Sequence, residues 1–155
     1  MPLLVEPLIS SLTTTMGKMN PSPAIFANEF TTALEAYIRP ILNMTGGNFI
    51  EWLTPRMQIM NISSVLNPSS NIYGMQLGRI IEVSFSTIQT RNQLGPVQIP
   101  EGILPSQFLG FFSALNPSSS ILAAQLGKAI HVFARGSVIT SVDMFTGTPV
   151  TGPIQ

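Results

Sequence analysis

The sequence of 155 residues contains no cysteine and little charge. Without cysteine, neither a disulfide framework nor a thiolate metal site is available, so stability has to come from packing. Charged residues make up 9% of the chain, whereas an ordinary soluble domain has about 25%. Seven Lys and Arg residues balance seven Asp and Glu residues, and no basic stripe is visible. Nucleic acid is therefore disfavoured as a main partner, because phosphate binding needs clustered cations.

Long apolar runs and export signals are also missing. No apolar run reaches the roughly 18 residues of a membrane span, because prolines and Asn-Pro-Ser segments interrupt each candidate. The N-terminus "MPLLVEPLISS" has no basic region before its apolar residues, so we expect no signal peptide. The polar positions are filled mainly by neutral side chains. A surface of low charge favours permanent association with other protein, since charged residues are depleted at interface cores.

Patterns for catalysis or cofactor binding do not occur. The single histidine, His131, aligns with Glu82 and Glu35 in the repeats described below, and we interpret this position as a polar site on a helix surface. One Asp and six Glu residues are scattered along the chain, whereas a metal site needs several converging ligands. There is no glycine-rich phosphate loop, HExxH pattern or GxSxG elbow. The sequence predicts no enzyme activity, no cofactor, no metal and no small-molecule substrate.

The most informative feature present is a repeat in three copies. The segment "LNPSSNIYGMQLGRIIEVSF" starts at residue 66, and "LNPSSSILAAQLGKAIHVFA" starts 49 residues later. A weaker copy, "MNPSPAIFANEFTTALEAYI", starts 47 residues before the first of these. Counted from Ile25, Ile72 or Ile121, large apolar residues recur at positions 0, 1, 5, 9 and 13, with alanine at the last position of the third copy. We interpret this spacing as one stripe of an α-helix.

Each copy also carries a helix-start signal. Ser22, Ser69 and Ser118 are predicted helix caps, and the Asn-Pro before each serine ends an earlier element. That earlier element is a shorter helix of about three turns, and the helix after the serine has about four turns. Small residues at one shared repeat position, Thr31, Gly78 and Gly127, predict close helix crossings, because glycine inside a helix costs about 1 kcal/mol relative to alanine.

We therefore expect a mainly α-helical single domain made of three helix-turn-helix hairpins. Residues 1–47 form repeat 1, residues 48–100 form repeat 2 with a linker, and residues 101–155 form repeat 3 with an extended C-terminal tail. Two arrangements fit: a short solenoid or a closed pseudo-threefold bundle. Chain breaks are expected at Pro40 and at Gly46-Gly47, and short strands at residues 86–89 and 138–142.

The non-helical segments are the expected contact surfaces. The linker has no helical face to join, and a proline-rich tail is ordered only when something holds it. Addition of this tail as a strand to a neighbour's sheet edge is the predicted mechanism. One tryptophan is a further candidate, with a core position as the alternative. The interface candidates are Trp52, Leu94, Val97, Ile99, Val138, Ile139, Phe145, Val150 and Ile154.

The repeated capped helices and the ending "VITSVDMFTGTPVTGPIQ" resemble small structural proteins of tailed bacteriophages. Those proteins combine repeated helical segments with short β-like stretches and Gly/Pro tails. The resemblance implies a virion component of the tail, baseplate or capsid periphery, made in the host cytoplasm, whose partners are other structural proteins and copies of itself. An alternative is a discrete oligomeric adaptor or binding module outside any particle. A membrane-active protein is a third class, although the chain lacks spanning length and a basic amphipathic face.

Overall fold

The computed structural model describes residues 3–18, 22–44, 53–64, 70–88, 93–113, 118–143 and 145–153. These residues are mainly helical, as the repeat predicts, and they end in a small antiparallel sheet. The helices are α1 (Val5–Met16), α2 (Pro23–Met44), α3 (Leu53–Ser63), α4 (Ser70–Ser86), α5 (Ile103–Ser113) and α6 (Ser119–Gly136). The strands are β1 (Val138–Val142) and β2 (Pro149–Pro153). None of these helices is both long and apolar enough to cross a membrane.

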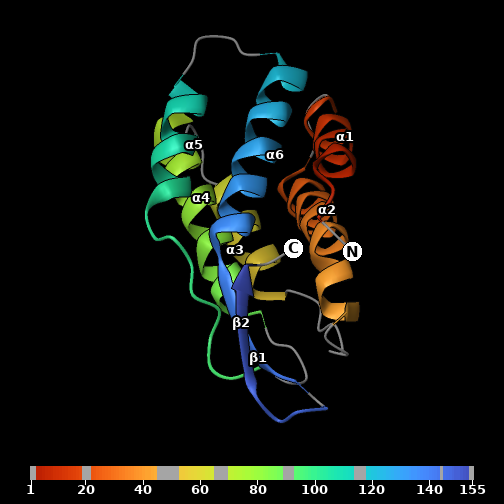
Figure 1. The fold of residues 1–155 in the computed structure, drawn as a ribbon. Helices are drawn as coiled ribbons and strands as arrows, with labels where there is room; N and C mark the ends of the chain where they lie inside the picture. The colour runs from red at the N-terminus through yellow and green to blue at the C-terminus, as the bar shows by residue number, and fades with distance from the viewer. Residues whose placement is uncertain are drawn as a thin grey trace.

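The helices pack in a closed set, with the β hairpin at one end (Figure 1). Each helix contacts the next one along the chain, and α6 returns to contact α1. An open row of helices would leave α1 and α6 apart. The most extensive packing joins α4 to α5 and α1 to α6, which are helices of different predicted repeats. The contacts among the described residues therefore do not show three separate hairpins that each pack as a unit.

Hydrogen bonds at the starts of α2 and α6 explain where these helices begin. The hydroxyl of Ser22 accepts from the backbone N–H of Ile25 at 3.2 Å, and the hydroxyl of Ser118 accepts from that of Ile121 at 3.2 Å. Each bond satisfies one of the N–H groups that have no partner within the first helical turn. Ser69, the third predicted cap, lies outside the described residues.

The apolar repeat supplies the core, with one correction. At about 100° per residue, positions 5, 9 and 13 fall at about 140°, 180° and 220° around the helix, whereas position 0 falls on the opposite side. The interpretation of all five positions as one stripe was therefore wrong, and Ile25, Ile72 and Ile121 are 50%, 50% and 58% exposed. The residues at positions 5, 9 and 13 are at most 1% exposed: Phe30, Leu34, Ile38, Leu77, Ile81, Phe85, Leu126, Ile130 and Ala134.

Two further expectations about element boundaries were wrong. Helix α2 continues through Pro40 to Met44, although a proline inside a helix removes one backbone hydrogen bond and its ring crowds the carbonyl four residues earlier. Helix α4 continues to Ser86, and residues 87 and 88 form no strand, so the strand expected from residue 86 does not begin there. The strand expected at residues 138–142 is confirmed with the same bounds. Gly46, Gly47 and residue 89 lie outside the described residues.

Glycines allow the closest helix contacts. A Cβ atom added to Gly78 in α4 would lie 2.7 Å from backbone atoms of Leu104 and Pro105 in α5. A Cβ atom added to Gly127 in α6 would lie 2.6 Å from Cγ1 of Ile9 in α1. At the same repeat position in α2, Thr31 is completely buried. A side chain at Gly78 would therefore push α5 away from α4, and a side chain at Gly127 would collide with the side chain of Ile9 in α1.

Candidate functional site

One repeat position carries a polar side chain in all three copies: Glu35, Glu82 and His131. Glu35 and Glu82 are buried and His131 is half-buried, so the interpretation of this position as a helix-surface site was wrong. Burial of a carboxylate is costly unless hydrogen bonds or an opposite charge compensate it. Each of these three side chains has such a partner, and the partner comes from another helix or from the residues that lead into one.

Glu82 ties α4 to the start of α5. Its two carboxylate oxygens accept from the backbone N–H groups of Gly102 at 3.0 Å and of Leu104 at 2.9 Å. The N–H groups of a first helical turn have no partner inside the helix, and the helix dipole favours negative charge there. A residue of one repeat thus caps the first helix of the next. The alignment of Glu35 with Glu82 was the sequence signal for this role, but the bonded N–H groups could not be identified from it.

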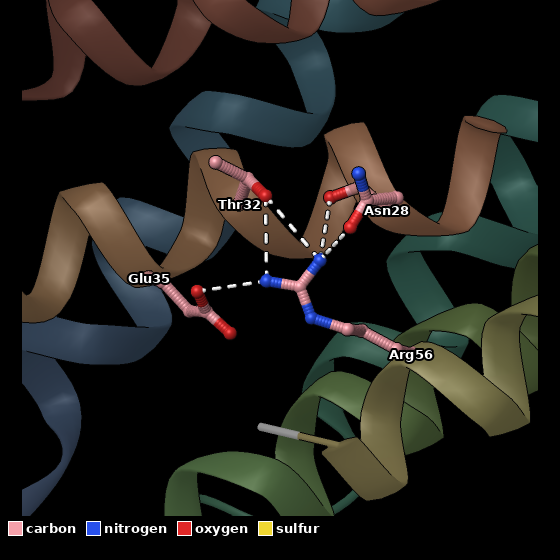
Figure 2. Close-up of polar contacts among 4 residues, drawn as sticks. All are labelled: Asn28, Thr32, Glu35 and Arg56. Carbon is pink, nitrogen blue, oxygen red and sulfur yellow. Dashed lines mark hydrogen bonds and ion pairs between the residues drawn. The ribbon is translucent and has the colours of Figure 1, made fainter. Parts of the chain in front are cut away.

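Glu35 lies in a polar cluster that ties α2 to α3 (Figure 2). Arg56 of α3 reaches across to α2, and its Nη2 donates to Oε2 of Glu35 at 3.0 Å. Its Nη1 donates to the carbonyl oxygen of Asn28 at 3.1 Å and also to the Asn28 side chain. Both nitrogens lie 3.4 Å from the hydroxyl of Thr32. Glu35 is buried and Arg56 is half-buried, so removal of Arg56 would take a charge-assisted hydrogen bond away from a buried carboxylate.

His131 of α6 shares a hydrogen bond of 2.8 Å between its Nδ1 and the hydroxyl of Tyr37 in α2. Burial lowers the pKa of His131, the charge of Arg135 lowers it further, and the charge of Glu6 opposes both. Burial also raises the pKa of Tyr37, against the effect of Arg135. The two rings are therefore neutral at pH 7. Among the described residues, no group of three His, Asp or Glu side chains could hold a metal ion.

The predicted contact segments come together at the β end of the molecule. Strand β1 pairs with β2 on one side, in a register that runs from Val138 opposite Pro153 to Val142 opposite Pro149. On its other side β1 contacts the linker: the N–H of Leu94 donates to the Thr140 carbonyl at 2.8 Å. Gln98 and Val138 exchange two further backbone bonds of 2.9 and 2.8 Å. The linker and the tail thus form one surface although they are far apart in sequence.

The interface candidates divide into buried and exposed residues. Val97 is buried in the core, and Ile99 and Ile139 pack against it, so the expectation that the linker has no helix to join was wrong. The backbone bonds to β1 hold the linker beside this strand. Val138 is half-buried, and Trp52 and Ile154 lie outside the described residues. The exposed candidates, called the β-end patch below, are Leu94 (47% exposed), Phe145 (100%) and Val150 (55%).

The turn between β1 and β2 lies beyond the ends of the helices (Figure 1). Phe145 in this turn is completely exposed. One carboxylate oxygen of Asp143 accepts from the N–H of Phe145 at 2.8 Å and from that of Thr146 at 3.4 Å. The N–H of Gly147 donates to the Asp143 carbonyl at 2.8 Å, with Gly147 at a φ of 68° that favours glycine. The turn is therefore held by its own hydrogen bonds, and the aromatic ring of Phe145 takes part in none of them.

The outer edge of β2 is a poor template for another strand. In β1, the backbone polar groups of Val138 and Thr140 point to the linker and therefore away from β2. Their partners in β2 are Pro153 and Thr151. Because opposite residues of an antiparallel pair behave alike, the backbone polar groups of Thr151, Pro153 and Pro149 face away from β1. Of these three residues only Thr151 has an N–H to donate. Prolines on an exposed edge block strand addition. The tail pairs with its own β1, so the predicted contact by strand addition has little support at this edge.

No family model, curated protein or solved structure matches the chain.

Proposed function

We propose that the protein is a non-enzymatic structural component of a large assembly, present in many copies, which contacts its neighbours through the β-end patch. The observation that carries this proposal is Phe145, whose ring is fully exposed on a turn held by hydrogen bonds that do not involve the ring. Burial of a phenylalanine side chain is worth about 1.5–3 kcal/mol, and aromatic side chains at such positions are typical interface anchors. The low charge of the chain, 9%, agrees with a surface that meets other protein.

The assembly that we propose is the virion of a tailed bacteriophage, with the protein in the tail, the baseplate or the capsid periphery. The resemblance of the capped helical repeats and of the C-terminal ending supports this choice. The proposed partners are other structural proteins and copies of the same chain. The second candidate, a discrete oligomeric adaptor outside any particle, shares the β-end patch and differs in the size of the native species.

We also propose that the helices are three repeats arranged around a pseudo-threefold axis. Equivalent burial of positions 5, 9 and 13 in each copy supports this arrangement, as does the contact of α6 with α1. The shared polar position supports it further. Glu35 bonds α3, Glu82 bonds the residues at the start of α5, and His131 experiences the charge of Glu6 in α1. In each copy the second helix thus interacts with the first helix of the next copy around the ring.

The test of the proposed function is incorporation of a variant with the β-end patch made polar. Leu94→Ser, Phe145→Ser and Val150→Ser combined change three exposed side chains, so we expect the melting temperature to stay near that of the wild type. Incorporation into native particles should fall below detection. The control is Val132→Ser, which changes an exposed apolar residue of α6 that is not part of the patch and should incorporate normally. Normal incorporation of the triple variant would contradict the proposed function.

A further inference from the structure

We propose that Phe145 of one copy inserts into the groove between α3 and α4 of a second copy, so that the chain associates with itself head to tail. This inference rests on the proposed function and names one partner of the β-end patch. It differs from strand addition, because it uses a side chain and needs no free strand edge.

The groove has the size and the lining that an aromatic ring requires. Its volume is about 350 Å³, and its apolar walls are Ile62 of α3 with Ile80 and Val83 of α4. A cavity of about 150 Å³ already accommodates benzene, so the groove has room for a phenylalanine ring and part of its turn. The remaining lining consists of three carboxamide side chains and Arg79. Carboxamides in this position can bond the backbone of an inserted turn.

The charges of the groove and of the turn are complementary. Arg79 is exposed in the groove and forms no ion pair with any residue that the structure describes. A guanidinium group next to apolar walls is a good partner for the face of an aromatic ring. Asp143, the only aspartate of the chain, lies in the same turn as Phe145. One of its oxygens accepts the bonds of the turn, and the negative charge favours approach to Arg79.

The turn and the groove are different surfaces of the molecule, so this contact is not self-complementary. Phe145 is completely exposed on its own chain and therefore does not fill its own groove. After two copies have joined, one turn and one groove remain free. Such a heterologous contact adds further copies until the rotation closes a ring, or continues as a filament. This behaviour suits a component that is present in many copies.

The test uses two variants that each disable one side of the contact. Phe145→Ala removes the ring, and Val83→Glu places a charge in the groove that repels Asp143. Each should weaken self-association, measured by sedimentation velocity over a range of concentrations, by about 30-fold or more, as at an interface hot spot. The matched control is Val132→Glu, because Val132 is an exposed valine and occupies the position of Val83 in the third copy. It should associate like the wild type, and Phe145→Trp, which keeps an aromatic ring, should also associate.

Mixing the two disabled variants gives the sharper result. Phe145→Ala retains an intact groove and Val83→Glu retains an intact turn, so the mixture should form dimers and stop there, although each variant alone stays monomeric. A wild type that is monomeric throughout, an unchanged mass of Phe145→Ala, or a mixture without dimers would overturn the inference. If the triple-serine variant still fails to enter particles in that case, the proposed function stands and the partner of Phe145 is a different protein.

Discussion

Replacement of Gly78 by alanine sets two effects of one methyl group against each other. Inside an exposed helix, the change from glycine to alanine stabilises by about 1 kcal/mol. At Gly78, however, the new Cβ atom would lie 2.7 Å from backbone atoms of Leu104 and Pro105, well inside the contact distance of about 3.5–4.0 Å. Glu82 holds the start of α5 in place by two hydrogen bonds. The clash can therefore be relieved only by moving α5 away from α4.

The size of the effect follows from these two terms. Overpacking of a well-packed interior costs about 1–3 kcal/mol, and we expect the upper end because backbone cannot rotate away as a side chain can. After subtraction of the gain of about 1 kcal/mol from helix propensity, the free energy of unfolding should fall by about 2 kcal/mol. In a domain of this size 1 kcal/mol shifts the melting temperature by about 2–4 °C, so we expect a decrease of about 4–8 °C.

The matched control is Gly110→Ala in α5. A Cβ atom added at Gly110 would meet nothing within 4 Å, so only the propensity term remains and stability should rise by up to about 1 kcal/mol. Calorimetry or thermal unfolding followed by circular dichroism measures both variants. Opposite signs are the expected result. If Gly78→Ala is as stable as the wild type, α4 and α5 do not meet at Gly78 and the packing described here is refuted.

Three further predictions concern the polar contacts and the tail. Glu82→Gln should lower the free energy of unfolding by about 1–3 kcal/mol in denaturant titrations, because the amide NH₂ faces a backbone donor; the exposed Glu101→Gln should lower it less. The pKa of His131 is lower in the folded protein than in the unfolded chain, where it is about 6.5. The contribution of neutral His131 to the free energy of unfolding is therefore complete above about pH 6.5, and it is lost as the pH falls through the folded pKa. His131→Gln should remove this part of the pH dependence, and equal slopes for both proteins would contradict it. Deletion of residues 147–155 should preserve the helical circular dichroism and the cooperative melt, since the described residues of β2 belong to no buried cluster, but should abolish incorporation.

Local periodicity predicted the core because helical spacing alone decides which residues share a face. Leu77, Ile81 and Phe85 are buried as their spacing requires. Ile72 is exposed because its position lies on the opposite side of the helix from these three residues. Contacts between distant segments could not be predicted in this way. Val97 is buried because its segment pairs with Val138, and nothing near Val97 in the sequence indicates that pairing.

In the candidate site, too, a local feature could be predicted from the sequence and a contact between separate elements could not. Phe145 was predicted as a contact residue of a non-helical tail, and the structure places it, completely exposed, on a turn. The groove between α3 and α4 was not predicted, because its lining comes from two helices and mixes apolar with carboxamide side chains. Helix α3 separates its apolar and polar residues only weakly. A sequence pattern of that kind does not show which face remains open after folding.

We propose that many copies of this chain work inside a large assembly and hold their places through the β-end patch. The most direct measurement is the size distribution of the native protein, separated by sedimentation and identified by mass spectrometry, for the wild type beside the triple-serine variant. We expect that the wild type is recovered with large particles and that the variant is recovered as a small species. Recovery of both proteins as the same small, defined oligomer would contradict it.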